Sequence, residues 1–554
     1  MDYSCFAPPA APSADQTAIS SNPACTVAMD FFSTAAITAL YPSISGYAKD
    51  AERDATYYGR MYKAYSAVHS AVFNGGTNTE AVLANLDEKY SLILDPSKGK
   101  VPKVPFGKTG IMMPVLTLGC MRFQETWNGA KFTDVKDIDA ACQANLKAIL
   151  VHALERGVNH IETARGYGAS ELQLGQAIKE VLEDETLPYK REDLIIQSKI
   201  GCMETNEEFL TTLEKSFEYM KVSYFDLVSF HGAGNKESDY ERIFGEGGLY
   251  SAIKPYLDDG RIKNLGFSTH GPTASICKLI ATDKFDYVNL HYHWCGSYTA
   301  SGHAPTEADC GHGNESAVKM CRVRQMGVFC ISPVDKGGGV HNASYKLRGM
   351  TEAQGMDPVE YSVAWTIGRH DTQTIGCARP EDLDEVFLAA TKSADADYRA
   401  RVEAVESSVT AALDAVHGAA WAKTWHVGLP TCFESDSGVS FGAYVWFYNL
   451  LHALGMHWYV EQRHSTGVNN LKKFSPLAEE GKSRDELMKD WGFMPGNEPT
   501  ATADYSEVLK DVPPENLERV KSILAGFKTL VDEFGAKDEC KSVDMRPWKA
   551  FPER

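Results

Sequence analysis

Short apolar runs alternate with longer amphipathic stretches from about residue 104 to about residue 390. The apolar runs cover residues 115–121, 158–164, 194–200, 225–231, 262–270, 285–294, 327–334 and 372–378. Repeated units of an apolar strand and an amphipathic helix are typical of a parallel sheet with helices outside it. This pattern constrains the fold most, because it leaves a choice between a closed barrel and an open doubly wound sheet.

Eight such units in about 290 residues favour a closed (β/α)8 barrel. An open sheet that binds a dinucleotide would carry G-x-G-x-x-G after its first strand. Here the first apolar run leads instead into GCMRFQ at residues 119–124. We therefore predict an α/β fold with a TIM barrel over residues 104–392.

The two flanks of this segment have a different composition. Residues 1–27 are rich in Ala, Pro and Ser and are expected to be disordered. Residues 28–103 have helical apolar spacing, broken at Gly75 and Gly76, and predict a mostly helical extension that packs on the barrel. Residues 393–554 also predict a mostly helical region.

The net charge of −19 argues against nucleic acid or an anionic membrane as the main partner, because both require a basic surface. No apolar run is long enough to span a bilayer. The first residues lack both a basic segment followed by an apolar one and an Arg-rich transit peptide, so a cytoplasmic location is expected. The 13 cysteines include no C-x-x-C pair and suit a reducing compartment.

Four polar side chains follow three neighbouring strands of the predicted barrel, at the ends where TIM barrels carry their chemistry. They are Glu162, Tyr167, Lys199 and His231. A phenol is a weak acid at neutral pH, and an adjacent ammonium lowers its pKa, while a carboxylate keeps that ammonium charged. A histidine can orient a carbonyl oxygen. Each residue alone could be structural, but the four together favour an active site with a proton donor.

These residues resemble the Asp/Tyr/Lys/His tetrad of the aldo-keto reductases, which are NADPH-dependent carbonyl reductases on a (β/α)8 barrel. Glu162 stands where that family usually has aspartate, and it is one methylene longer. The resemblance covers residues 104 to about 390. It implies reduction of a small-molecule aldehyde or ketone by hydride transfer, with Tyr167 as the general acid.

The resemblance also implies a set of residues that bind NADPH. They are Gly119, Met121, Ser268, Thr269, Asn289, Ser332, Lys336, Cys377, Arg379 and Glu385. Ser268, Thr269 and Asn289 would contact the nicotinamide carboxamide, and the last three residues of the set the adenosine phosphate. Arg379 is a candidate partner for a ribose 2′-phosphate, which favours NADP over NAD.

The C-terminal region resembles the tail of aldo-keto reductases that carry a ferredoxin-like iron–sulfur module. In that branch a cysteine cluster precedes a helix similar to WFYNLL at residues 446–451. Here Cys432 stands alone at that place, and a [4Fe–4S] cluster requires four thiolates. We therefore predict a degenerate, helical region without an iron–sulfur cluster.

A second group of polar residues lies between residues 291 and 312. It contains His291, His293, Cys295, His303, Cys310 and His312. Their spacing matches no common zinc motif, so we favour a lining of the substrate pocket over a metal site.

One alternative function stays open at this point: a catalytically weak or inactive barrel that serves as a binding or structural subunit of a larger assembly. The substitutions at Thr269 and at Ile331, where the family usually has an aromatic residue, favour it. The intact Tyr167, Lys199 and His231 favour an enzyme. The N-terminal extension is the candidate surface for a protein partner.

Overall fold

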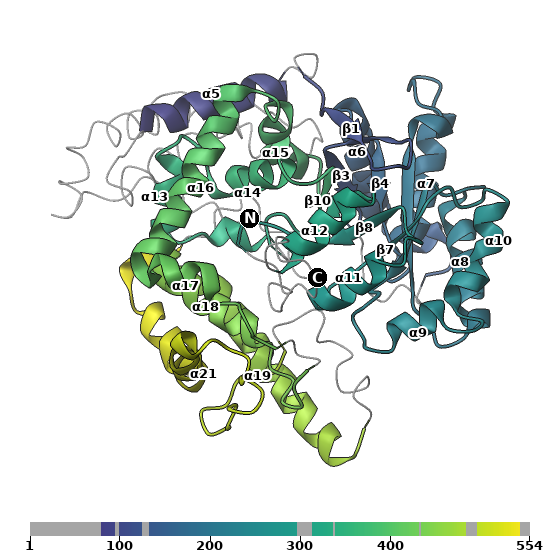
Figure 1. Ribbon diagram of the computed structural model, residues 1–554. Coiled ribbons are helices and arrows are strands. Elements are labelled where there is room, and N and C mark those ends of the chain that lie inside the picture. The colour runs from purple at the N-terminus through teal and green to yellow at the C-terminus, as the bar shows by residue number, and fades with distance from the viewer. Residues whose placement is uncertain are drawn as a thin grey trace.

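The computed structural model describes residues 79–94, 99–123, 132–295, 313–335, 338–430, 434–482 and 496–542 (Figure 1). Its centre is a closed parallel barrel in the order β10-β3-β4-β5-β6-β7-β8-β9. The strands are β3 (Leu116–Gly119), β4 (His160–Glu162), β5 (Ile195–Gly201), β6 (Leu227–His231), β7 (Leu265–Ser268), β8 (Tyr287–Leu290), β9 (Gly327–Cys330) and β10 (Thr372–Gly376). Each strand lies within one predicted apolar run, except that β5 extends one residue beyond its run to Gly201, so the predicted TIM barrel is confirmed.

The helices of the barrel cover its outside because each has an apolar face. They are α6 (Ala140–Glu155), α7 (Ser170–Glu183), α8 (Asn206–Met220), α9 (Asp239–Phe244), α10 (Leu249–Asp258), α11 (Thr273–Ile280), α12 (Asn314–Val323), α13 (Tyr345–Glu352), α14 (Pro358–Ile367) and α15 (Glu381–Thr391). Outward strand residues such as Ile161, Ile196 and Val288 join these helices in the main hydrophobic core. The alternate strand residues point into the barrel, as the pleat requires.

A short hairpin closes the end of the barrel opposite the candidate site. Its strands β1 (Lys103–Pro105) and β2 (Met112–Pro114) pair antiparallel, and Gly107 in the connection has φ of +52°. Phe106 and Met113 pack against a small apolar cluster that Ile195, Leu227, Tyr287 and Phe329 contribute from the barrel. This apolar plug leaves the other end, where the strands terminate, as the entrance.

Helix α5 (Thr79–Leu94) is the part of the predicted N-terminal extension that the structure describes. It packs on α15 and α13. Two polar contacts join it to α14 and the residue before that helix: Asn85 donates to Glu360 at 2.6 Å, and Lys89 lies 3.2 Å from Asp357. Residues 1–78, including the segment expected to be disordered, lie outside the described residues.

The C-terminal region is helical, as predicted. It contains α16 (Ala396–His417), α17 (Ala419–Thr424), α18 (Phe441–Leu454), α19 (His457–Glu479) and α21 (Pro514–Gly535). These helices gather beside the barrel on the side of α13 and α14 (Figure 1). Helix α18 is buried along most of its length, because apolar residues surround it and neighbouring helices cover it.

Within the described residues, no helix is both long and apolar enough to span a bilayer. Cys540, in the C-terminal region, is buried, whereas Cys432 lies outside the described residues. The exact boundaries of the regions and the absence of an iron–sulfur cluster therefore stay predictions.

Candidate active site

The structure brings Glu162, Tyr167, Lys199 and His231 together at the open end of the barrel. Glu162 ends β4, Lys199 lies on β5 and His231 ends β6, while Tyr167 is in the turn between β4 and α7. Adjacent parallel strands place these residues in register, because Lys199 pairs with Ser229 and Gly201 with His231. The sequence alone predicted this grouping.

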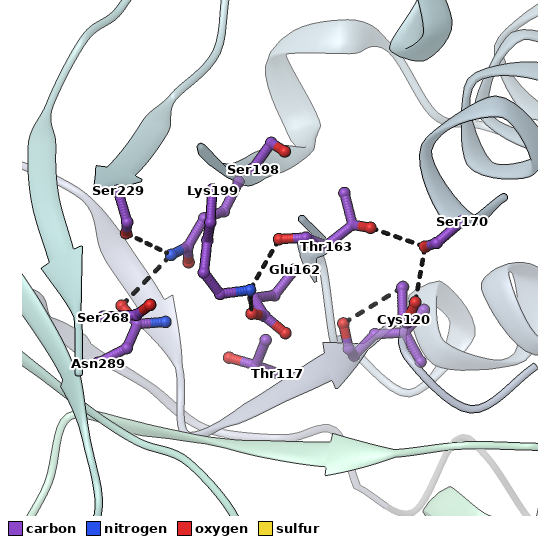
Figure 2. A network of polar contacts seen from close by, with 12 residues as sticks. Thr117, Cys120, Glu162, Thr163, Ser170, Ser198, Lys199, Ser229, Ser268 and Asn289 are labelled. Carbon is purple, nitrogen blue, oxygen red and sulfur yellow. Dashed lines mark hydrogen bonds and ion pairs between the residues drawn. The ribbon is translucent and has the colours of Figure 1, made fainter. Parts of the chain in front are cut away.

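The Lys199 ammonium is enclosed by three groups. It forms an ion pair with the Glu162 carboxylate and donates to the Thr163 carbonyl oxygen at 2.8 Å (Figure 2). Its Nζ also lies 4.5 Å from the centre of the Tyr167 ring. Lys199 is 1% exposed and Glu162 is 2% exposed, so the pair is shielded from water. The longer glutamate therefore still reaches the lysine.

The Tyr167 and His231 rings pack edge to face, with their centres 5.6 Å apart. Both side chains are partly exposed, unlike the buried lysine and glutamate. A substrate at the barrel entrance can therefore reach the phenol and the imidazole but not the ion pair beneath them. This arrangement suits Tyr167 as a proton donor and His231 as the group that orients the substrate. The buried Lys199 ammonium can then stabilise negative charge on the phenol.

Burial governs the protonation of this group. It raises the pKa of the Tyr167 phenol, and the nearby Arg122 opposes that effect. The pKa of Tyr167 is therefore raised in the folded protein rather than lowered, because burial outweighs the effect of Arg122. Burial also lowers the pKa of Lys199, so the Glu162 carboxylate is needed to keep the ammonium charged.

The turn that carries Tyr167 is held by residues that the sequence analysis did not single out. Ser170 donates to the Cys120 carbonyl at 2.6 Å and shares a hydrogen bond of 2.7 Å with Thr163 (Figure 2). Glu171, which is 1% exposed, accepts from Arg165 at 2.7 Å and from Ser198 at 2.5 Å. The motif RGYGASE at residues 165–171 contained this signal, since it places a carboxylate one turn after the tyrosine.

The residues expected at the nicotinamide lie around the same entrance. Gly119 ends β3, and a Cβ there would lie 2.3 Å from Thr374, so this strand end must stay free of a side chain. Met121 follows it and is partly buried. Ser268, at the end of β7, accepts a hydrogen bond from the Gly232 amide at 3.3 Å.

Thr269 and Asn289 lie next to each other across β7 and β8. The Thr269 amide donates to the Asn289 carbonyl at 3.0 Å, and the Thr269 hydroxyl accepts from the Gly271 amide at 3.1 Å. The Asn289 side chain is fully buried, yet its Nδ2 has no acceptor among the residues that the structure describes. Buried amide groups are normally paired, so this atom is a candidate donor to a ligand.

The residues expected at the phosphates and the adenosine lie on the β9 and β10 sides. Ser332 has φ of +57° in the turn after β9, while Lys336 lies outside the described residues. Cys377 is buried after β10, and burial raises its pKa. Arg379 precedes α15, with its Nε 3.7 Å from Asp382. Glu385 lies 3.5 Å from His341, and burial raises the pKa of Glu385 to about 8.

These residues fit a pyridine nucleotide at two points. One point is the unpaired Asn289 Nδ2, which matches a carboxamide oxygen. The Arg379 guanidinium, at the start of α15, supplies positive charge for a phosphate near a helix N-terminus.

The histidine-rich segment after β8 forms contacts within the protein. His291 and His270 share a hydrogen bond of 2.6 Å, and His293 lies 2.9 Å from Cys295. Within the described part of the chain, no group of three or more His, Cys, Asp or Glu could hold a metal ion. His303, Cys310 and His312 lie outside that part, so the metal alternative keeps no support from the described residues.

The C-terminal helices hold the turns after β8 and β9. Trp446 on α18 donates to the Cys295 carbonyl at 2.9 Å. Arg463 on α19 donates to both carboxylate oxygens of Asp335, each at 2.7 Å. Both residues of this second pair are buried. The C-terminal region therefore contacts the turns that follow β8 and β9 at the entrance of the barrel.

Comparisons with known proteins agree with this architecture. The family profile described as "Aldo/keto reductase family" matches residues 115–406. The L-glyceraldehyde 3-phosphate reductase of Escherichia coli is 21% identical over 317 residues, which cover 50% of this chain and 84% of that protein. The NAD(P)H-dependent 6′-deoxychalcone synthase of Glycine max is 33% identical over 94 residues, only 17% of this chain and 29% of that enzyme.

Among solved structures, an aldo-keto reductase from Bacillus halodurans is similar at 15% identity and a TM-score of 0.39. The match covers 55% of this chain and 96% of that protein. No functional conclusion follows from a likeness at this level.

Proposed function

The chain belongs to the aldo/keto reductase family of NAD(P)H-using oxidoreductases, and from this premise we propose that it is an NADPH-dependent reductase of aldehydes or ketones. Tyr167 is the general acid in this proposal. The observation that carries it is the buried Lys199 ammonium, which contacts the Glu162 carboxylate and lies 4.5 Å from the Tyr167 ring. Burying a charge is costly unless it is paired, and this buried pair lies beside a partly exposed phenol at the entrance of the barrel.

Each residue has a distinct task. The Tyr167 phenol is protonated at neutral pH, since its ordinary pKa is near 10 and burial raises that pKa further, so it holds the proton that the carbonyl oxygen needs. When that proton leaves, the negative charge develops above the Lys199 ammonium, which stabilises it. His231 packs against Tyr167 and donates to the same carbonyl oxygen, which fixes the substrate. Bound NADPH would supply the hydride.

We assign the cofactor to Asn289 and Ser268 at the carboxamide and to Arg379 at the 2′-phosphate. A guanidinium binds a phosphate through several parallel hydrogen bonds, and this favours NADP over NAD. Met121, Thr269, Ser332, Lys336, Cys377 and Glu385 complete the proposed cofactor site. The substrate is a small carbonyl compound that enters between Tyr167 and the turn after β8.

The test measures NADPH binding and turnover separately. Binding is followed by quenching of tryptophan fluorescence, and turnover by NADPH oxidation with a panel of aldehydes and quinones. Tyr167→Phe should keep the affinity for NADPH and lose at least about 100-fold in turnover. The matched control Tyr189→Phe removes a hydroxyl far from the entrance and should change neither.

Binding of NADPH without turnover on any substrate, unchanged in Tyr167→Phe, would contradict the proposal. That result would favour the alternative, a barrel that serves as a binding or structural subunit.

A further inference from the structure

A continuous chain of polar side chains crosses the barrel interior below Lys199. Thr372 and Thr117 share a hydrogen bond of 2.8 Å, and Thr117 lies 2.7 Å from Nδ1 of His160. Nε2 of His160 lies 3.0 Å from Oε1 of Gln197. Gln197 Nε2 then reaches Ser229 at 3.2 Å and Asn289 Oδ1 at 3.3 Å. All of these side chains are buried, although the interior of a barrel is usually filled by apolar ones.

In the structure the hydrogen bonds of this chain have a defined direction at Gln197. Its amide nitrogen donates to Ser229 and Asn289, so its carbonyl oxygen faces His160 and accepts from Nε2. The imidazole is neutral, because burial lowers the pKa of His160 to about 3. A neutral ring carries one proton, so Nδ1 accepts from the Thr117 hydroxyl. This tautomer of His160 agrees with the observed orientation of the Gln197 amide.

The orientation of Gln197 in turn fixes Asn289. With Asn289 reversed, its Nδ2 would face the Gln197 Nε2, and two donors would meet without an acceptor. The observed orientation turns Oδ1 toward Gln197 and leaves Nδ2 buried without an acceptor among the described residues. In Figure 2 Ser229 and Asn289 lie on one side of Lys199, and Glu162 and Thr163 lie on the other.

We propose that His160 and Gln197 are positioning residues that hold Asn289 as a hydrogen-bond donor toward the carboxamide oxygen of the nicotinamide. This inference rests on the proposed function. The inference adds a hydrogen-bonded set of interior residues, from Thr117 through His160 to Gln197, that directs Asn289 Nδ2 toward the cofactor. The orientation of the Asn289 side-chain amide is then set by the protein and not by the cofactor, so the donor is in place before the cofactor binds.

The first experiment measures dissociation constants for NADP+ by calorimetry in a double-mutant cycle. Gln197→Met keeps the length of the side chain but removes its donors, and it should weaken NADP+ binding about 3- to 10-fold, the worth of one neutral hydrogen bond. Gln373→Met is the matched control: this glutamine is also fully buried on a barrel strand, but it bonds outward to Val363. It should leave the affinity unchanged.

The cycle separates positioning from a general structural effect. In an Asn289→Leu background, Gln197→Met should have no further effect on the affinity, because Gln197 acts through Asn289. An equal loss in both backgrounds would overturn the inference, and so would equal affinities of Gln197→Met and Gln373→Met.

The second experiment tests the direction of the amide and needs no substitution at Gln197. The 3-acetylpyridine analogue of NADP+ keeps the carbonyl oxygen but replaces the amide nitrogen by a methyl group. Asn289→Leu should weaken the binding of NADP+ and of the analogue by the same factor if Asn289 donates to the oxygen. A smaller loss for the analogue would mean that Asn289 accepts from the amide nitrogen, and it would overturn the inference.

Failure of the inference and failure of the proposed function give different results. If the unsubstituted protein binds no NADP+, the proposed function falls and the inference falls with it. If it binds NADP+ but the cycle is additive, only the inference falls.

Discussion

Two buried ion pairs, one in the barrel and one between the barrel and the C-terminal helices, use similar groups in different ways. Lys199 and Glu162 lie on adjacent strands at the entrance, beside a partly exposed tyrosine. Arg463 and Asp335 join α19 to the turn after β9, through two hydrogen bonds of 2.7 Å. The tyrosine beside the first pair is partly exposed, whereas Tyr459, the tyrosine beside Arg463, is buried.

The difference lies in the cation. A guanidinium stays charged, and Nη2 of Arg463 donates to both carboxylate oxygens of Asp335, so the Arg463 pair is a fixed brace. An ammonium is a point charge whose pKa shifts on burial, and burial lowers the pKa of Lys199. The Lys199 pair can therefore respond to a charge that develops on Tyr167. Burial of an ion pair alone does not distinguish an active site from a structural brace. The distinguishing feature is a partly exposed proton donor, Tyr167, beside the Lys199 pair.

The largest effect is expected for Lys199→Met. This change keeps a similar volume but removes the charge below Tyr167, so we expect turnover to fall about 100- to 10,000-fold. The affinity for NADPH, measured by fluorescence, should change little. A variant within 10-fold of the unsubstituted protein in turnover would make the Lys199 pair a brace like the other.

Arg463→Met should act on stability rather than on chemistry. It leaves the Asp335 carboxylate buried without its partner, which costs about 3 to 5 kcal/mol of unfolding free energy. The thermal midpoint measures this loss. Turnover per folded molecule should stay within about 10-fold.

The matched control is Arg463→Met combined with Asp335→Asn, which removes both charges. It should recover a large part of the lost stability, because no buried charge is left unpaired. If the double variant is no more stable than Arg463→Met alone, the pair is not the brace that we describe.

The smallest effect concerns pH. Burial lowers the pKa of His293, near the Asp335–Arg463 pair, to about 4. The unfolded chain therefore binds one proton more than the folded protein between about pH 6.5 and pH 4, and stability is lost as the pH falls through this range. His293→Gln should reduce the pH slope of the unfolding free energy by about 1.4 kcal/mol per unit near pH 5. An unchanged slope of the thermal midpoint would contradict this assignment.

The sequence predicted the barrel because each strand is a short apolar run with an amphipathic helix after it. It also predicted the grouping of Glu162, Lys199 and His231, because parallel strands bring their ends to one edge. The pairing of Arg463 with Asp335 could not be predicted, since the two residues are 128 positions apart and no local pattern joins them. The interior chain from Thr117 to Asn289 was also missed, because single polar residues inside apolar runs carry no periodic signal.

The direction of the Tyr167 pKa shift was wrong for a related reason. The sequence identified Lys199 near the phenol but neither Arg122 nor the burial of the phenol, and burial has the largest effect on the pKa of Tyr167. Local patterns therefore give strand ends and partners, while burial depends on the whole fold.

The central claim is that the Glu162 carboxylate keeps Lys199 charged so that Tyr167 can give up its proton. Turnover of Glu162→Asp and Glu162→Gln, with NADPH affinity measured on the same samples, tests it most directly. Aspartate keeps the charge, so turnover should stay within about 10-fold, whereas glutamine should lose at least about 100-fold at unchanged affinity. Equal turnover of the two variants would contradict the account.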